Sequence, residues 1–308
     1  MPKPIIAAVD PRHEDVAPAA LGALLSRLTG APLTLAAAYP VELSVDNVYP
    51  EYARALGLEA DRAVQRVAAL AEAAGVPATA TAIRTGGSPA RALHGLAEDS
   101  DAKLLVIGSS RRGPIGRVLA SAVTDRLLRG APCPVAVAPV GFTFEDANAS
   151  PGVIGVAFTD TPDGHAALAT ARALAAPARA RVRVLTVAEP LDMLVTGSLD
   201  ASMLEDVRRA RHTAAEAVLR RGIEALPENL SAGGQILSGR PADALAAASE
   251  GLGLLVCGSR GYGPVRTLLL GGTAHALVRK AACPVLVVPR APDDGVDGDR
   301  ADDRTVAA

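Results

Sequence analysis

The chain has 308 residues, of which 49% are hydrophobic and 21% charged, and its formal net charge is -2. This length is about twice that of a usual domain, so two domains are the first expectation. The small net charge and the 2% aromatic content argue against a nucleic-acid binder, an anionic-membrane binder and a base-stacking platform. Three cysteines cannot form a disulfide framework, and no Cys/His spacing predicts a metal site.

The N-terminal residues MPKPIIAAVD contain only a short apolar run before the charges of Asp10 and Arg12. They do not resemble a secretory signal, and no apolar stretch approaches the roughly 18 residues that span a bilayer. We therefore expect a cytoplasmic protein with no membrane partner.

Short apolar runs alternate with longer amphipathic stretches, which is typical of βαβ units and a parallel sheet. In the first half, strands are predicted at residues 5–9, 33–38, 78–84, 104–107 and 135–138. Helices are predicted between them at residues 16–28, 51–74, 89–98 and 118–129. In the second half, strands are predicted at residues 153–158, 182–187, 234–237, 254–257 and 285–288. The sequence thus predicts an α/β protein with two tandem, doubly wound, parallel five-stranded sheets of Rossmann-like type.

The two halves are copies of one unit. Residues 108–139 and 258–289 are identical at 13 of 32 positions, at a constant offset of 150. Upstream, GGSPARAL (86–93) matches SGRPADAL (238–245). Such self-similarity predicts a duplicated domain.

The repeat also sets the expected boundaries. We predict domain 1 at residues 1–140, a linker at 141–151 and domain 2 at 152–290. The remaining residues, 291–308, include six Asp and two Arg with little apolar content. That composition predicts a disordered acidic tail.

A glycine-rich segment follows the fourth predicted strand of domain 2, with Gly258, Gly261 and Gly263 before the pair Gly271-Gly272. Glycine lets backbone N–H groups come close to an anion, and a helix N-terminus after the pair would add unpaired donors. The arrangement favours a phosphate cradle, although strand-to-helix loops also need glycine simply to turn. No GxxxxGK[ST] motif is present, which excludes a Walker-type ATPase.

The repeated βα units, the G-2x-G-9x-G segment and the last strand ACPVLVV resemble the tandem universal stress protein family from about residue 4 to 290. The resemblance implies a fold like that of the adenine-nucleotide hydrolases, with ATP or AMP bound at the glycine segment. It also implies an Asp at the end of the first strand that contacts the base. The last strands of the two domains would pair across a twofold axis, as an intramolecular pseudo-dimer, and a homodimer is a further option.

The two copies depart from the family pattern in opposite ways. Domain 1 keeps the acid as Asp10, but Arg111 replaces the second glycine and Ser121-Ala122 replaces the closing pair. Domain 2 keeps the glycines, but Thr159 replaces the acid. Because loss of a cradle glycine obstructs the phosphates while loss of the acid removes one hydrogen bond, we expect domain 2 to be the competent site. An alternative is that Arg111 and Arg112 supply charge to the phosphates in domain 1.

The resemblance assigns binding residues in both copies. In domain 2 they are Ala157, Thr159, Val187, Gly258, Ser259, Arg260, Gly261, Gly263, Gly271, Gly272 and Thr273. The weaker set in domain 1 is Asp10, Ala38, Gly108, Ser109, Gly113 and Ser121. No residue is assigned as catalytic.

The expected function is binding of an adenine nucleotide, with ATP ahead of AMP or ADP and Mg²⁺ held mostly by the phosphates. The output would be stress-response regulation through a conformational change or a protein partner. Two alternatives stay open, a nucleotide-free scaffold with decayed sites and a slow ATPase. An enzyme of the hydrolase type is disfavoured, because neither 10–13 nor 159–162 supplies an SGGxDS-like loop.

Three further residues have competing interpretations. Cys133 and Cys283 occupy equivalent positions in the two copies. They could form a redox link, or they could be small buried core residues, and we favour the second interpretation. His275, near the start of the last predicted helix, is expected to be an exposed helical histidine.

Overall fold

Each half of the chain contains five strands in the computed structural model, which describes residues 2–12, 15–40, 50–85, 88–109, 122–189, 200–259 and 271–289. The strands of domain 1 are β1 (Ile5–Ala8), β2 (Leu33–Pro40), β3 (Ala78–Thr85), β4 (Leu104–Gly108) and β5 (Val135–Ala138). Its helices are α1 (Ala17–Thr29), α3 (Pro50–Ala73), α4 (Pro89–Asp99) and α5 (Ala122–Leu128). A short helix, α6 (Phe144–Asn148), lies within the predicted linker.

Domain 2 repeats this order. Its strands are β6 (Val153–Ala157), β7 (Arg181–Ala188), β8 (Ala232–Ser238), β9 (Leu254–Gly258) and β10 (Val285–Val288). Its helices are α7 (Pro162–Ala178), α9 (Ala201–Glu224), α10 (Pro241–Ala248), the 3₁₀ turn η1 (Ser249–Gly251) and α11 (Gly272–Lys280). The predicted strands are thus all present, with ends that differ by at most two residues.

The strands of both domains join in one ten-stranded sheet with the order β3-β2-β1-β4-β5-β10-β9-β6-β7-β8. Within each domain the strands are parallel, while β5 and β10 pair antiparallel with Val137 opposite Val285 and Val135 opposite Val287. The predicted pairing of the last strands is therefore confirmed, and the two predicted sheets are halves of one continuous sheet. The central strands β5 and β10 therefore run in opposite directions where the two domains meet.

This register also settles the cysteine question. Extending it places Cys133 opposite residue 289 and Cys283 opposite residue 139, at the two ends of the strand pair. Six residues of extended chain separate these points, which corresponds to about 20 Å. Both thiols are free and buried, so the redox link considered from the sequence is wrong and the core interpretation holds.

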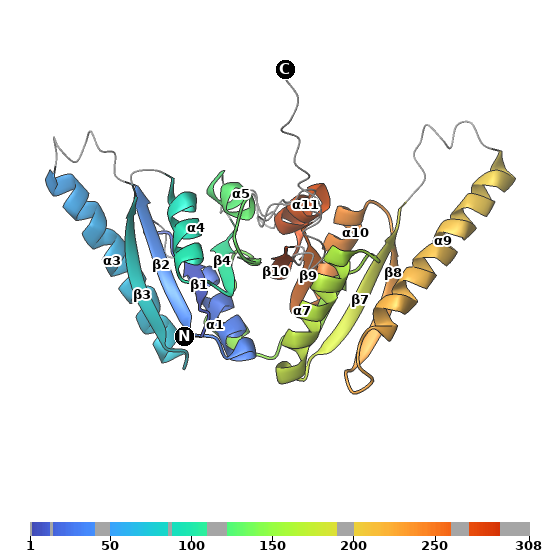
Figure 1. Cartoon of the computed structure of the whole chain (residues 1–308), viewed down its shortest axis with the longest axis horizontal. Helices are drawn as coiled ribbons and strands as arrows, with labels where there is room; N and C mark the ends of the chain where they lie inside the picture. The colour runs from blue at the N-terminus through green and yellow to red at the C-terminus, as the bar shows by residue number, and fades with distance from the viewer. Residues whose placement is uncertain are drawn as a thin grey trace, which may run out of the picture.

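Helices cover both faces of the sheet (Figure 1). Helices α1, α3, α7 and α9 lie on one face, and α4, α5, α10 and α11 lie on the other. Covered on both sides, the central strands are continuous apolar runs, such as β4 and β9, each with four buried residues in succession. Val, Leu, Ile and Ala fill this core almost alone, with Phe158 as its largest fully buried side chain.

The segment between the domains is held to domain 1. Thr143 and Asp146 form a capping box at the start of α6. The guanidinium group of Arg27, on α1, donates to the backbone oxygen of Asn148 at 3.1 Å and to its side-chain oxygen at 3.2 Å. The segment thus packs against the end of α1.

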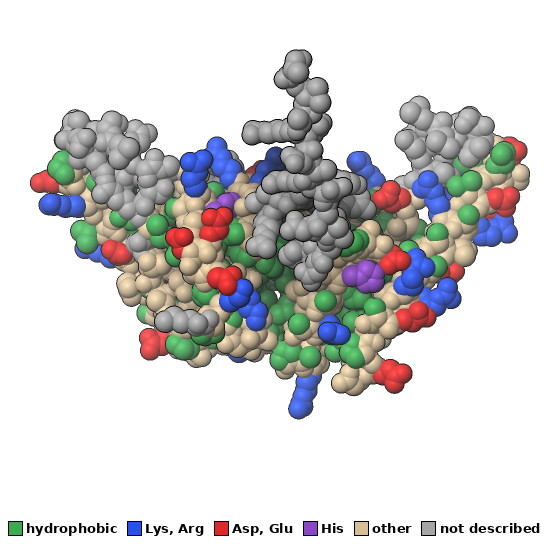
Figure 2. All heavy atoms as spheres, viewed as in Figure 1, with side chains coloured by type: hydrophobic (Ala, Val, Ile, Leu, Met, Phe, Trp, Pro, Cys, Tyr) green, Lys and Arg blue, Asp and Glu red, His purple; other side chains and the backbone are tan. Residues whose placement is uncertain are grey.

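Charged side chains of both signs are mixed over the face of the molecule in Figure 2. Within the part of the chain that the structure describes, no helix is long and apolar enough to cross a membrane.

Candidate functional site

A cavity of about 100 Å³ lies in domain 2 at the carboxyl ends of β6, β7 and β9. The strand order reverses between β6 and β9, and such a switch point is where open α/β sheets bind ligands. The N-termini of α7 and α11 close the cavity, together with α10. The lining residues are Ala157, Phe158, Thr159, Asp163, Gly164, Leu185, Val187, Glu189, Pro241, Leu245, Cys257, Gly258, Gly271, Thr273, Ala274 and Leu277.

The cavity brings together much of the predicted domain 2 site. Six predicted residues line it, namely Ala157, Thr159, Val187, Gly258, Gly271 and Thr273. Ser259 is buried beside it, with 1% of its surface exposed, while Gly272 is exposed. Arg260, Gly261 and Gly263 lie outside the described residues.

The start of α7 packs very closely on the end of β6. A Cβ placed on Gly164 would lie 1.9 Å from the carbonyl oxygen of Thr159, so only glycine fits there. The side chain of Thr161 caps the helix by accepting from the backbone N–H of Gly164 at 3.2 Å. The hydroxyl groups of Thr159 and Thr161 lie 3.0 Å apart, so Thr159 uses its hydroxyl within the turn.

Gly258, at the end of β9, also allows a close approach. A Cβ on this residue would lie 2.7 Å from the Cβ of Asp163 and 2.9 Å from the Asp163 carbonyl oxygen. The first glycine of the predicted cradle is therefore required by contact with α7. No left-handed backbone conformation is involved at this position, since Gly258 is not among the positive-φ residues.

The pair Gly271-Gly272 opens the last helix, as predicted. Gly271 is the N-cap of α11 and adopts an extended conformation, and no side chain among the described residues caps this helix. The N–H of Gly271 donates to the Ser259 carbonyl at 2.9 Å. A Cβ on Gly272 would meet nothing within 4 Å. The first backbone N–H groups of α11 thus lack side-chain caps at the rim of the cavity.

A charged cluster lies beside the site on α7 and α9. The Asp160 carboxylate lies 2.8 Å from Nε2 of His165 and 2.6 Å from Nε of Arg221. The hydrogen bond from His165 is the main cause that lowers the pKa of Asp160, and Arg221 acts in the same direction. None of these three residues lines the cavity.

Domain 1 is different at the equivalent strand end. The carboxylate of Asp10 accepts from the backbone N–H of Arg12 at 3.0 Å and from its Nε at 3.1 Å. These bonds raise the pKa of the Arg12 guanidinium. Ala38 is buried in β2, Ser109 is buried after β4, and Gly108 contacts the start of α1. Gly113 and Ser121 lie outside the described residues, as do Arg111 and Arg112.

The position of His275 differs from the expectation. Its Nε2 lies 3.0 Å from Oδ1 of Asp125, and the two side chains are 28% and 31% exposed. The interpretation as an exposed helical histidine is therefore wrong. At the repeat offset of 150, Asp125 is the residue equivalent to His275, so the pair joins α5 and α11 across the pseudo-twofold axis.

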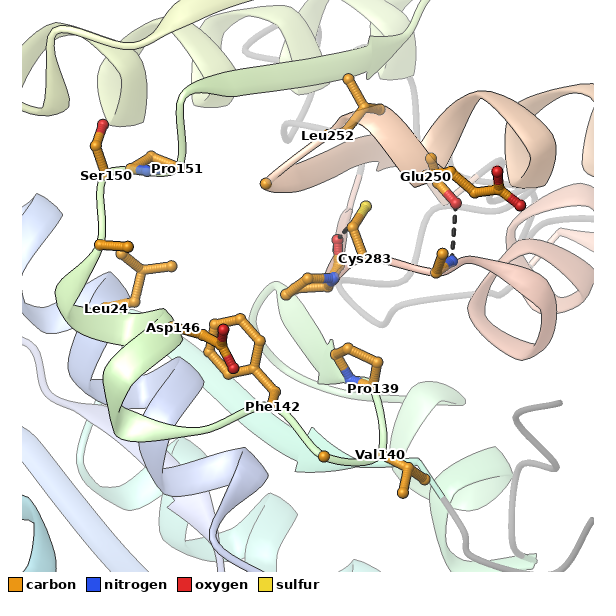
Figure 3. A pocket seen from close by; sticks show the side chains of 16 residues that line it. Leu24, Pro139, Val140, Phe142, Asp146, Ser150, Pro151, Glu250, Leu252 and Cys283 are labelled. Atoms are coloured by element: carbon orange, nitrogen blue, oxygen red, sulfur yellow. Dashed lines mark hydrogen bonds between the residues drawn. The ribbon is translucent and has the colours of Figure 1, made fainter. Parts of the chain in front are cut away.

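A larger cavity, of about 390 Å³, lies away from this site (Figure 3). It is formed by the segment around α6, by Leu24 of α1 and by the chain that enters β9 and β10. Phe142 and Asp146 face it from the α6 side, and Leu252 and Cys283 face it from domain 2. None of the residues predicted for nucleotide binding lines it.

Sequence reasoning did not single out several lining residues of the smaller cavity. They are Asp163, Gly164, Glu189, Pro241, Leu245 and Leu277. A signal for the first two was present, because Thr161-Pro162 is an N-cap followed by Pro at the first helical position. That signal places residues 163 and 164 in the first turn of a helix at the carboxyl edge of the sheet. No group of three or more potential metal ligands is present among the described residues.

The fold and the site together define a tandem α/β protein with a cavity of about 100 Å³ at the switch point of its second half. The model of the universal stress protein family matches residues 1–139 and 152–289. The chain belongs to this family, and the resemblance drawn from its sequence is confirmed.

Relatives support the same assignment. A universal stress protein of Mycobacterium tuberculosis is 30% identical over 191 residues, which cover 61% of this chain and 62% of that relative. The aligned region thus spans less than two thirds of the length of that protein. A universal stress protein of Thermus aquaticus is 34% identical over 139 residues, 43% of this chain and 95% of the relative. A crystal structure of a universal stress protein from Archaeoglobus fulgidus has a TM-score of 0.64 at 19% identity, covering 93% of this chain and 98% of that one, which shows a shared fold.

Proposed function

We propose that this protein binds an adenine nucleotide, with ATP preferred, in the domain 2 cavity. The observation that carries the proposal is the position of that cavity. It lies at the switch point of the sheet, between apolar walls and a helix N-terminus that no described side chain caps.

The two sides of the cavity suit the two parts of a nucleotide. Leu185, Leu245 and Leu277 give an apolar wall on which a base can lie. The N-terminus of α11 offers backbone donors and a favourable dipole to a phosphate. The cavity is small compared with common ligand pockets of about 300–1,000 Å³, so we place the nucleoside inside it and the phosphates at its rim.

Mg²⁺ fits this arrangement only as a companion of the phosphates. The described residues around the cavity supply two carboxylates, Asp163 and Glu189, and no cluster of three ligands. The phosphates would then provide most of the coordination. The geometry gives no arranged base, so slow ATP hydrolysis remains a second candidate without a residue assigned to it.

We further propose that nucleotide binding changes the surface that a protein partner recognises, in a cytoplasmic stress response. A ligand that binds one conformation more tightly than another shifts the population toward that conformation by its differential affinity. We also propose that domain 1 comprises residues 1–140 and domain 2 comprises residues 152–290. A scaffold that binds no nucleotide is the rival.

Calorimetric titration with ATP tests the proposal, using Gly272→Asp as the variant. An Asp at the first position of α11 stabilises the helix through its dipole, but it repels phosphate from the same N–H groups. We expect the affinity for ATP to fall by about tenfold or more, since repulsion at close range is worth more than 1 kcal/mol. Thermal stability should not fall.

The matched control is Ala122→Asp, the equivalent change at the start of α5 in domain 1. It should leave the affinity unchanged if domain 2 holds the nucleotide. If Ala122→Asp is the variant that weakens binding, the site is in domain 1. If the wild-type chain binds neither ATP, ADP nor AMP, the scaffold rival is correct.

A further inference from the structure

Two buried side-chain oxygens have no hydrogen-bond partner among the described residues, Oγ of Ser109 and Oδ1 of Asp163. Asp163 lines the domain 2 cavity, at the start of α7 and directly against Gly258. A carboxylate can only accept hydrogen bonds when ionised, and a buried acceptor without a donor costs about 1–3 kcal/mol. The position of Asp163 therefore requires a reason beyond the packing of α7.

The helix itself does not need this carboxylate. Thr161 already accepts from the backbone N–H of Gly164 and caps α7. Nearby cations are also engaged elsewhere, because His165 and Arg221 both pair with Asp160. Among the described residues of the cavity, the other charged group is the carboxylate of Glu189, which is not a donor.

Domain 1 offers a direct contrast. There Asp15 lies beside Gly108, with its Oδ2 3.4 Å from the position of a Cβ on that glycine. Its Oδ1 accepts from the backbone N–H of Ala17 at 3.1 Å. The acid beside the strand-end glycine thus bonds to the start of its helix in domain 1, whereas in domain 2 one oxygen is buried and free to accept.

The kind of group that could donate a hydrogen bond to Oδ1 of Asp163 follows from its charge and surroundings. A phosphate would be repelled by Asp163, and a single carboxylate oxygen is a poor site for a metal ion. A neutral hydroxyl or amino group fits best, because its hydrogen bond to a carboxylate is charge-assisted and leaves no charge uncompensated. A nucleoside carries such groups on its ribose and on its adenine ring.

We propose that Asp163 is a specificity residue of the domain 2 site, which accepts a hydrogen bond from a neutral donor on the nucleoside part of the ligand. In domain 2 the position of the base-contacting acid is occupied by Thr159, whose hydroxyl already bonds to Thr161. Asp163 supplies the carboxylate that this position lacks. The inference rests on the proposed nucleotide binding and adds the residue that selects the ligand.

The test measures the affinity of the whole chain for four ligands, in the presence and absence of Mg²⁺. They are ATP, 2′-deoxy-ATP, 3′-deoxy-ATP and the analogue that lacks the 6-amino group. We expect Asp163→Asn to weaken ATP binding about tenfold and Asp163→Ala up to about a hundredfold, the range of a hydrogen bond to a charged group. The analogue without the relevant donor should bind the variants and the wild type equally, which identifies the donor as ribose or base.

Asp160→Asn is the matched control. It removes the same charge from the same helix start, but its carboxylate bonds to His165 and Arg221 outside the cavity. We expect a change in ATP affinity of less than about twofold, in the range of exposed ion pairs.

Several outcomes would overturn the inference. Tighter binding of ATP by Asp163→Asn would mean that the carboxylate only repels phosphate. Equal losses for all four ligands would mean that the side chain only shapes the cavity, and a loss seen only with Mg²⁺ would assign Asp163 to the cation. If the wild type binds none of the four, the proposed function itself fails, and this inference fails with it.

Discussion

At the end of β1 the carboxylate of Asp10 is bonded to Arg12, while at the end of β6 the hydroxyl of Thr159 is bonded to Thr161. In both domains the residue at the predicted base-contacting position is therefore engaged by a neighbour two residues later. The domains differ in what lies next to that position. In domain 2 the Oδ1 atom of Asp163 is buried without a hydrogen-bond partner, and no carboxylate among the described residues of domain 1 has such an atom. The copies have diverged at the strand ends, where a ligand would bind, and have kept the same sheet.

The cores of the two copies remain alike. Cys133 and Cys283 occupy equivalent positions, and burial raises the pKa of each thiol to about 12. The same cause raises the pKa of Cys257, in β9, to about 12. The cysteines are buried in both copies and can therefore report on the interior of the sheet.

The largest predicted effect concerns these thiols. At pH 8 a thiol with a pKa of about 12 has roughly a thousandfold less thiolate than one with an ordinary pKa near 9. We expect all three cysteines to react with a thiol reagent only through opening of the fold. Mass spectrometry of peptides labelled over time would compare Cys133 with Cys283. Fast labelling of Cys133 alone would show that domain 1 opens independently.

The same shifts fix the direction of a pH effect. Because the folded-state pKa lies above the unfolded value, the stabilising contribution is complete below about pH 9 and declines as the pH rises toward 12. Denaturant titrations of the wild type from pH 8 to 11 should therefore show falling stability. Replacement of Cys133 and Cys283 by Ala should reduce the slope of that decline.

The next prediction compares the effect of one glycine substitution in each domain on stability. Gly164→Ala would place a Cβ 1.9 Å from the Thr159 carbonyl oxygen, so α7 must shift. Overpacking of this kind lowers the free energy of unfolding by about 1–3 kcal/mol. Gly95→Ala in α4 is the control, since a Cβ there meets nothing within 4 Å. The control should be neutral or stabilising by up to about 1 kcal/mol. Equal effects of the two variants would contradict the close packing of α7 on β6.

Much of this arrangement follows from the sequence. The alternation of apolar runs predicts the ten strands, and the resemblance to the universal stress protein family implies the pairing of β5 with β10. The lining of the cavity could not be predicted in the same way, because the tertiary fold alone brings Pro241 and Leu245 of α10 to the site. A local sequence pattern also could not predict the contact between His275 and Asp125. It depends on the twofold relation of the copies, which brings equivalent helices together.

The glycines show the same limit. Sequence reasoning attributed Gly258 to a cradle that turns around an anion, whereas the structure requires it for contact with Asp163. Residue type and spacing identified Gly258 as an important glycine, but they did not identify Asp163 as the neighbour whose close contact requires a glycine there. Gly164 has no place in the family motif quoted for the site, although its contact with Thr159 is the closest at this end of the sheet.

A smaller effect tests whether the acid at the strand end limits binding. Thr159→Asp restores in domain 2 the acid that domain 1 has, and we expect ATP to bind about three- to tenfold more tightly, the gain of one hydrogen bond. Arg12→Gln removes the guanidinium bonds to Asp10 in domain 1 and keeps the backbone bond from residue 12. It should not create a second site, because Arg111 still replaces the loop glycine. Calorimetric stoichiometry distinguishes the two cases. Two bound nucleotides per Arg12→Gln chain would show that the Arg12 side chain, and not the loop around Arg111, silenced domain 1.

The smallest effect concerns the contact that joins the copies. Because α5 and α11 meet only where the pseudo-twofold axis brings equivalent positions together, the Asp125–His275 pair reports on the relative placement of the domains. Its side chains are 28–31% exposed, so we expect a coupling of about 0.5–1 kcal/mol, near the upper end for exposed pairs. A double-mutant cycle of Asp125→Ala and His275→Ala in denaturant unfolding measures it. A coupling of zero would mean that this side-chain pair adds nothing to the contacts that β5 with β10 and α1 with α7 make between the two halves.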